Sequence, residues 1–371
     1  MWIIILCLTI ELIFIAIFLK EINTSLMLKT PLVSICIPLY NASEYIHETL
    51  TRILNQTYKN IEVVVVDDYS TDESYTIAKT FESNKIRVLK NKKKGGNAAR
   101  NFAFQNSKGD YVKFMDADDY CSENMIKAQL ERLLKEGTNQ TLVFSKLRVS
   151  YLDVFYDYPR DIDKDYEPGI ELLVDIWRLK GYNCPHCYLL SRQLVEQTGG
   201  WNETILKNQD AEFFARVIAL ADKALSVPNE FAVWRQTGKG VSTNTSTEAI
   251  NSVIDTLDII SKLILRYNDT AEMREICGTY IGAYVLGNYS DIKHLLPKVE
   301  QLLHSINAKM KFPNRKLIRL FTFCFGWKSA LPLIYNLQVF KKSIIVFGLK
   351  IATKFKNKVK TDISKLNILV V

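Results

Sequence analysis

Three carboxylate side chains lie within four residues of one another, at Asp116, Asp118 and Asp119. They directly follow residues 111–115, a short run that indicates a buried strand. Carboxylates this close repel one another unless a cation offsets their charge, and a divalent metal that holds a diphosphate would do so. The cluster therefore predicts a metal–diphosphate site at the carboxyl end of a strand.

Polar residues also follow each of the three predicted strands that precede this cluster. One acid at a strand end usually caps the next helix, and this alternative stays open for any single position. Polar groups at four consecutive strand ends instead indicate a ligand site, because ligands of parallel sheets bind at the carboxyl ends of the strands. The earlier residues are Pro38, Tyr40, Asn41, Asp67, Asp68, Ser70, Asp72 and the segment Gly95 to Asn101.

The elements that must position these residues alternate between strand and helix from residue 32 onward. Short connections and a continuous β-branched run at residues 61–66 predict an α/β fold, with a Rossmann-like, mostly parallel central sheet and helices on both faces. The predicted strands are residues 32–37, 61–66, 86–89, 111–115 and 142–149. The predicted helices are residues 43–54, 71–81, 97–105, 125–134, 170–179, 192–197 and 211–221.

The pattern becomes helical with almost no strand signal from residue 248 onward, which places a boundary near residue 246. We therefore predict an α/β domain over residues 31–246 and a basic helical region over residues 247–371. Between Gln301 and Thr361 the chain has thirteen Lys or Arg residues and no Asp or Glu, interleaved with aliphatic runs. This combination favours contact with a membrane surface over nucleic acid; the alternative is an ordinary helical tail with a solvated basic face.

Residues 2–19 are apolar except for Thr9 and Glu11, and Lys20 and Lys29 follow them. This length is close to the minimum for a spanning helix, and neither a basic leader nor a cleavage site typical of a signal peptide accompanies it. Positive charges on the C-terminal side place that side in the cytoplasm. We predict a transmembrane or membrane-anchor helix at residues 1–20 and a location at the inner membrane, with the α/β domain on the cytoplasmic side.

The composition is typical of a folded protein with reduced thiols. With 371 residues, of which 48% are hydrophobic, the chain can form one large domain and a smaller one. Its seven cysteines are scattered and odd in number, which indicates buried thiols and not a disulfide framework. Cys184 and Cys187 have the spacing of half a zinc site, but no matching second pair of ligands exists in the sequence.

Four segments together resemble the motifs of the family 2 glycosyltransferases, which have the GT-A fold. They occur in the order and with the usual spacing of that family, and the resemblance covers about residues 31–240. The segments are Pro31 to Asn41, Val66 to Asp72, Gly95 to Asn101, and Asp116-Ala117-Asp118-Asp119, which resembles the DxD motif.

The resemblance implies a donor site for a nucleoside diphosphate sugar, with a UDP-sugar as the expected donor. Asp68 would accept a hydrogen bond from the imide N–H of a uracil-type base, Arg100 would pair with the diphosphate, and Asp118 would ligate Mn²⁺ or Mg²⁺. From the residues alone, Asp68 could instead cap a helix and Arg100 could form a surface ion pair. Asp116 would lie near the ribose. The implied nucleotide-sugar site comprises Pro38, Tyr40, Asn41, Asp68, Arg100, Asp116, Ala117 and Asp118.

The segment Gly199 to Glu203 and the acid Asp210 resemble the stretch of the family that carries the catalytic acid. This resemblance implies that Asp210 is the general base, whereas a helix cap is the alternative. The sequence departs from the family at Gln209, where Glu is commoner, and at Thr237, where a His often helps to bind the metal. His186 could replace that ligand, or it could be structural.

These features predict an inverting, metal-dependent glycosyltransferase of the hexosyl- or N-acetylhexosaminyltransferase class. It would move a sugar to a hydroxyl of a glycan or glycolipid, in the synthesis of a bacterial surface polysaccharide or lipooligosaccharide. A processive synthase would need several spanning segments and a Gln-x-x-Arg-Trp motif, which the sequence lacks. The alternative from another class is a non-catalytic sugar-nucleotide-binding or membrane scaffold protein with a decayed site, which Thr237 and Gln209 would favour. No nucleic-acid partner is expected.

Overall fold

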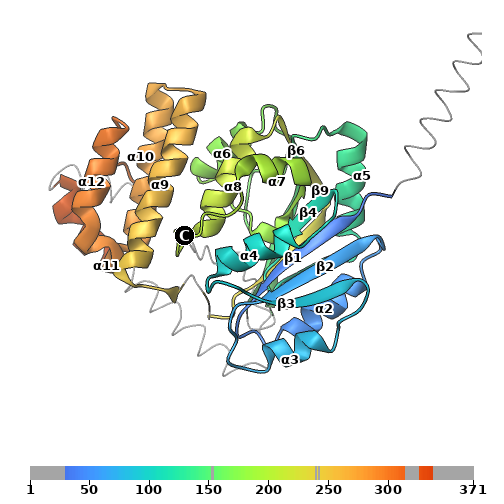
Figure 1. Ribbon diagram of the computed structural model, residues 1–371. Helices are drawn as coiled ribbons and strands as arrows, with labels where there is room; N and C mark the ends of the chain where they lie inside the picture. The colour runs from blue at the N-terminus through green and yellow to red at the C-terminus, as the bar shows by residue number, and fades with distance from the viewer. Residues whose placement is uncertain (1–29, 152–153, 239, 241–242, 314–325, 337–371) are drawn as a thin grey trace, which may run out of the picture.

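The computed structural model describes residues 30–151, 154–238, 240, 243–313 and 326–336. These residues form one nine-stranded sheet with the order β3-β2-β1-β4-β8-β6-β9-β5, and β7 pairs with β6 (Figure 1). The strands are β1 Val33–Leu39, β2 Ile61–Asp67, β3 Ile86–Lys90, β4 Tyr111–Phe114, β5 Tyr120–Cys121, β6 Thr141–Tyr151, β7 Val154–Asp157, β8 Tyr188–Ser191 and β9 Lys223–Arg235. The α-helices are α2 Ile46–Leu54, α3 Ser74–Lys79, α4 Gly96–Gln105, α5 Met125–Glu136, α6 Ile170–Trp177, α7 Arg192–Thr198, α8 Gln209–Leu220, α9 Thr247–Tyr267, α10 Ala271–Gly287, α11 Tyr289–Ile292 and α12 Leu296–Ser305.

The first four strands form the parallel half of the sheet, as predicted. β1 pairs in parallel with β2 and β4, and β2 pairs in parallel with β3. Helix α4 lies on one side of these strands, whereas α2 and α3 lie on the other side (Figure 1). Residues Val63 to Val66 have no exposed surface, because helices cover both faces of the strand. The carboxyl ends of β1, β2 and β4 therefore meet at one edge, where the polar segments of the sequence follow them.

The second half of the sheet is mixed, so the prediction of a mostly parallel sheet is wrong there. β8 is antiparallel to both β4 and β6, while β9 is parallel to β6 and antiparallel to β5. β8 and β9 were not predicted. The four residues of β8 are too few to show a period, and Pro228 interrupts β9, where its register with β6 shifts.

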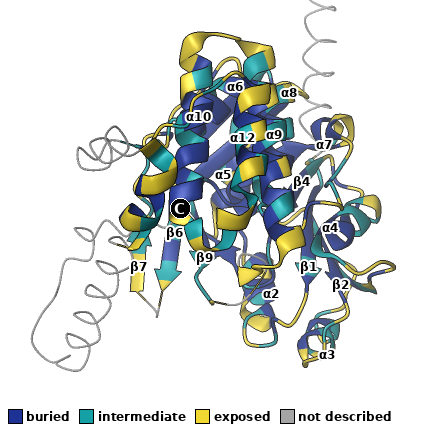
Figure 2. Cartoon of the chain, turned by 90° about the vertical axis from the view of Figure 1, so that its left-hand side faces the viewer, coloured by how far each residue is buried: buried dark blue, intermediate teal, exposed yellow. Residues whose placement is uncertain are grey.

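A group of helices follows the sheet. Ser246 caps α9 by accepting a hydrogen bond from the N–H of Ala249, and α9 packs on α8. Gly278 and Gly282 of α10 let the chain at Lys309 and Lys311 approach, because a Cβ at either glycine would lie 2.1 Å or less from a backbone oxygen. Figure 2 shows that buried residues line the sheet, whereas exposed residues gather in loops and at helix ends.

In the part of the chain that the structure describes, no helix has both the length and the apolar character needed to cross a membrane. The predicted membrane helix at residues 1–20 lies outside the described residues. The same is true of residues 314–325 and 337–361, which make up most of the basic segment. The membrane predictions therefore remain predictions.

Candidate active site

The acid cluster forms a tight loop between β4 and β5. The N–H of Asp119 donates to the carbonyl oxygen of Asp116 at 3.2 Å, and the Thr49 hydroxyl of α2 lies 3.0 Å from the carbonyl oxygens of both Ala117 and Asp119. Asp119 points inward and is buried, and one of its oxygens accepts the N–H of Arg235 at 2.8 Å. Asp119 therefore fixes the loop, while Asp116 and Asp118 are less buried.

Arg100 lies beside this loop, although it belongs to α4. Its Nη2 donates to Asp116 Oδ1 at 2.7 Å and lies 3.9 Å from Asp210 Oδ1. The guanidinium carbon also lies 4.6 Å from the centre of the Trp201 ring, at cation–π distance. The side chain is only 6% exposed, so its charge is held in place between the acid loop and Asp210. Arg100 is therefore not on the helix surface, as the alternative of a surface ion pair required, although its partner Asp116 is 29% exposed.

Asp210 is the second residue of α8, and the N-cap position belongs to Asn208, which has a left-handed backbone (φ 64°). Asp210 is therefore not the helix cap that the alternative interpretation required. Its Oδ1 is buried and makes no hydrogen bond within the described part of the chain. Burial raises the pKa of Asp210 to about 7; Arg100 opposes this increase and Asp116 adds to it. A carboxylate with a pKa near neutrality is suited to accept a proton.

Asp118, the predicted metal ligand, is a partly buried carboxylate of the acid loop. Burial and the neighbouring Asp116 raise the pKa of Asp118 to about 6, so its negative charge is poorly compensated. The Thr237 hydroxyl lies 3.5 Å from Asp118 Oδ2, and Arg235 Nη1 donates to the Asp118 carbonyl oxygen at 2.8 Å. The described residues contain no group of three or more His, Cys, Asp or Glu side chains that could hold a metal. A hard cation fits here only if the diphosphate completes its shell around Asp118 and the Thr237 hydroxyl.

His186 lies beneath the acid loop and does not face it as an open ligand. It is fully buried, its Nε2 lies 3.1 Å from the Val233 carbonyl oxygen, and its Nδ1 lies 3.4 Å from Asp119 Oδ2. Burial lowers the pKa of His186 to about 4, so the ring is neutral. The structural alternative for His186 is the better one. Cys184 and Cys187 beside it are free and buried, in agreement with the prediction of reduced thiols.

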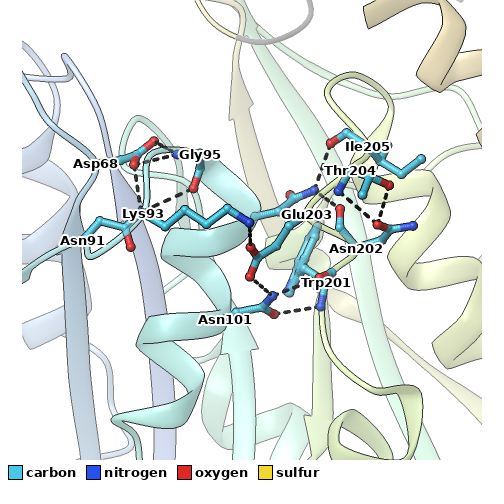
Figure 3. A network of polar contacts seen from close by, with 11 residues as sticks. Asp68, Asn91, Lys93, Gly95, Asn101, Trp201, Asn202, Glu203, Thr204 and Ile205 are labelled. Carbon is cyan, nitrogen blue, oxygen red and sulfur yellow. Dashed lines mark hydrogen bonds and ion pairs between the residues drawn. The ribbon is translucent and has the colours of Figure 1, made fainter. Parts of the chain in front are cut away.

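The residues predicted for the nucleobase lie at the ends of β1 and β2. Asp68 is 6% exposed, and its carboxylate accepts the N–H of Gly95 and the Nδ2 of Asn91 (Figure 3). Asn41, in a left-handed conformation, accepts the N–H of Thr71 at 2.8 Å and so ties the loops after the two strands together. Tyr40 is half-exposed, as an aromatic ring available for stacking would be.

The edge of the sheet thus brings together the sequence-predicted set. Pro38 is the second-last residue of β1 and pairs with Val66 of β2, and Ala117 is buried inside the acid loop. The sequence reasoning missed two roles. Arg235 binds Glu48 and the acid loop, and two asparagines of α4 bind the segment before α8. The sequence did contain a signal for the role of the asparagines. Residues three and four apart share one helix face, and this spacing relates Asn97, Arg100 and Asn101.

Comparisons with known proteins agree with this geometry. The model of the family described as glycosyl transferase family 2 matches residues 34–199. The glycosyltransferase GlyG of Streptococcus pneumoniae is 42% identical over 111 residues, which cover 29% of this chain and 37% of GlyG. The UDP-Glc:alpha-D-GlcNAc-diphosphoundecaprenol beta-1,3-glucosyltransferase WfaP of Escherichia coli is 42% identical over 100 residues, or 27% of this chain and 40% of WfaP. The chain therefore spans about two fifths of the length of these two relatives.

Among solved structures, S. aureus TarS 1-349 in complex with UDP-GlcNAc aligns with a TM-score of 0.57 at 20% identity. The alignment covers 69% of this chain and 73% of the TarS chain. At this identity the likeness establishes the fold, which is of the GT-A type with a mixed sheet. Residues 34–199 match glycosyl transferase family 2, and this match confirms the resemblance that the sequence predicted.

Proposed function

We propose that this protein is an inverting glycosyltransferase that moves a sugar from a nucleoside diphosphate to a hydroxyl group. In this reaction the acceptor oxygen attacks the anomeric carbon while the bond to the diphosphate oxygen breaks. The hydroxyl proton passes to the Asp210 carboxylate, and the nucleoside diphosphate leaves with the bonding electron pair. Single displacement of this kind inverts the configuration and forms no covalent enzyme intermediate.

The observation that carries the proposal is the placement of Asp210 opposite the acid loop. Its buried Oδ1 makes no hydrogen bond in the described part of the chain, and it lies 3.9 Å from the arginine that binds Asp116. An acceptor for a proton is thus held beside the residues that resemble a diphosphate site. A carboxylate that served only the fold would be expected to satisfy both of its oxygens.

A UDP-sugar is the donor that the comparisons support best. The name of WfaP specifies UDP-Glc, and TarS was solved with UDP-GlcNAc. In this chain we propose that Pro38 and Tyr40 contact the base and that Arg100 faces the diphosphate. Asp68 would accept a hydrogen bond from the imide N–H of the base with lone pairs that its present partners leave free. Mn²⁺ or Mg²⁺, when bound, would offset the charge of the diphosphate, with Asp118 as its carboxylate ligand.

The acceptor that we propose is a glycan or a lipid-linked glycan at the inner face of a bacterial membrane. The name of WfaP specifies a diphosphoundecaprenol-linked acceptor, and the apolar segment at residues 2–19 could hold the chain beside such a lipid. This placement suggests a role in the synthesis of a surface polysaccharide or lipooligosaccharide.

Removal of residues 1–20 tests whether the basic segment between Gln301 and Thr361 contacts the membrane. Some membrane association should remain after the removal. A truncated chain that is wholly soluble at low salt would contradict the role of this segment.

The metal role of Asp118 predicts a Mn²⁺-dependent stabilisation by the donor. At about 100 times its dissociation constant, a UDP-sugar should stabilise the folded chain by about 2.7 kcal/mol, because it binds the folded state only. Thermal unfolding with a panel of sugar nucleotides, with and without Mn²⁺, measures this effect. In Asp118→Ala the Mn²⁺-dependent part should vanish. In Asp222→Asn, whose carboxylate binds Thr138 and Thr141 instead, it should remain.

The base role of Asp210 predicts a fall in kcat on the acid side of neutrality. Because the pKa of Asp210 is raised to about 7, the carboxylate that must accept the proton is increasingly protonated below that pH. Below the pKa, kcat should then fall by about tenfold for each pH unit. The fall should therefore begin near pH 7. A kcat that rises toward acid pH would contradict this assignment.

A further inference from the structure

One face of α4 contacts the segment that leads to the proposed base. Asn97, Arg100 and Asn101 lie three and four positions apart, so they share this face. Arg100 contacts the acid loop and Asp210, whereas the two asparagines contact the backbone of residues 201–205. The helix thus touches both the donor side and the base side of the site.

Asn101 binds both backbone polar groups of Trp201, at the start of this segment. Its Oδ1 accepts the N–H of Trp201 at 2.8 Å, and its Nδ2 donates to the Trp201 carbonyl oxygen at 2.9 Å (Figure 3). The same Nδ2 lies 3.1 Å from Glu203 Oε1. Gly200 makes this approach possible: it has a φ of +78°, and a Cβ there would lie 2.8 Å from Asn101 Oδ1.

Asn97 holds the next part of the segment in the same way. Its Nδ2 donates to the carbonyl oxygens of Asn202 at 2.7 Å and Ile205 at 3.1 Å. Asn97 is buried, so these backbone oxygens receive bonds that water cannot readily replace. The segment then runs directly through Asn208 into α8, where Asp210 is the second residue.

The N-terminus of α4 is also attached to the predicted nucleotide side. The N–H of Gly95, which precedes the helix, donates to Asp68 at the end of β2. Lys93 of the same turn forms an ion pair of 2.6 Å with Glu203, in the centre of the network in Figure 3. A single short helix therefore sets the spacing between the residues proposed for the nucleotide and the segment before Asp210.

We propose that Asn101 and Asn97 are positioning residues for the general base, which fix residues 201–205 on α4 and so place Asp210 against Arg100 and Asp116. This inference rests on the proposed function, in which Asp210 receives the acceptor proton. The asparagines touch neither substrate nor the reacting atoms. They act through the backbone of the segment, and loss of either should displace Asp210 more than it disturbs donor binding at Asp68 and Asp118.

The test compares Asn101→Ala with the parent in kcat, in the dissociation constant for UDP with Mn²⁺, and in the pH dependence of kcat. We expect kcat to fall by about 10²-fold, because a displacement near 1 Å at a reacting group costs that much. The dissociation constant for UDP should stay within about twofold, since Asp68 and Asp118 keep their contacts. The acid limb of kcat should move to lower pH, because a loosened segment admits water to Asp210 and relieves its burial.

Asn106→Ala is the matched control, since Asn106 ends the same helix and its side chain binds only the Phe102 carbonyl oxygen of that helix among the bonds described. It should leave kcat and its pH dependence unchanged. Asn97→Ala is the second variant, should Asn101→Ala fail to fold, and the same three changes are expected of it.

The inference is overturned if Asn101→Ala and Asn97→Ala lose UDP binding in proportion to kcat, or if they keep the parental kcat and pH profile. Asp210→Asn separates this failure from failure of the proposed function. If Asp210→Asn is as active as the parent, the base assignment itself is wrong. If Asp210→Asn is inactive while both asparagine variants behave like Asn106→Ala, only the positioning role is wrong.

Discussion

Asp210→Asn is expected to lower kcat by about 10²- to 10⁴-fold, the contribution of a positioned general base, and at the same time to stabilise the fold. The catalytic loss follows because an amide cannot take up the acceptor proton, whereas Arg100, Asp116 and Asp118 keep the donor site intact. UDP with Mn²⁺ should therefore still bind. Initial rates and a UDP titration measure both quantities.

The gain in stability follows from the raised pKa of Asp210. The pKa of Asp210 in the folded state, about 7, exceeds its ordinary value of 3.8. Between these two pH values the folded state therefore keeps a proton that the unfolded state has released. The group therefore destabilises the fold increasingly from about pH 4 to about pH 7 and by a constant amount above that, and Asn at this position removes that cost. About 24% of the side chain is exposed, so we expect a gain of only about 1–2 kcal/mol at pH 8 and almost none near pH 4.

Glu212→Gln is the matched control for Asp210→Asn. Glu212 lies in the same first turn of α8 and is buried, but both of its oxygens bind Arg216, at 2.6 and 2.8 Å. Its loss should lower the free energy of unfolding and leave kcat nearly unchanged, the opposite of the effect at Asp210. If Asp210→Asn also destabilises the fold and keeps its activity, Asp210 is a structural residue and not the base.

Arg100→Met should be the most destabilising single change in the site. It removes the cation that lies 2.7 Å from Asp116 and 3.9 Å from Asp210, and so leaves both carboxylates uncompensated beside Asp118. Removal of one partner from a fully buried ion pair costs about 3–5 kcal/mol. Because Asp116 and Asp210 are 29% and 24% exposed, we expect about 2–3 kcal/mol, which denaturant unfolding measures at pH 8. Transfer activity should be lost together with this stability, because the diphosphate would meet three carboxylates and no arginine.

Two further variants separate the charge of Arg100 from its shape. Arg100→Lys keeps the charge but loses the planar fork and the stacking on Trp201, so we expect an intermediate loss. Arg52→Met removes an exposed ion pair with Glu48 and should cost about 1 kcal/mol or less. If Arg100→Met costs no more than Arg52→Met, the acids of the loop do not depend on Arg100.

The sequence predicted the part of the site that local patterns determine. Residues 61–66 form a buried strand because four consecutive valines admit little else, and the acids that follow β2 and β4 must meet at one edge of a parallel sheet. The motif order then indicated the family. Strands β8 and β9 of the mixed half of the sheet were not predictable, since one is only four residues long and a proline interrupts the other.

The contacts within the site depend on tertiary packing that no local pattern shows. Arg100 was expected at the diphosphate, yet its direction toward Asp116 and Asp210 depends on how α4 packs over β1. The substitution at Thr237 suggested a weakened metal site from the sequence alone. The structure adds that the hydroxyl lies 3.5 Å from Asp118, where a His would otherwise be expected.

The central claim is that this chain transfers sugars and that Asp210 is the base. Release of UDP by the full-length chain, measured with Mn²⁺, a panel of UDP-sugars and a lipid-linked glycan acceptor, tests it most directly when Asp210→Asn is measured in parallel. The account predicts acceptor-dependent release by the parent from at least one donor, and almost none from Asp210→Asn, although the variant still binds that donor. If the parent binds a UDP-sugar but releases no UDP from any of them, the chain is a sugar-nucleotide-binding protein and the claim is contradicted.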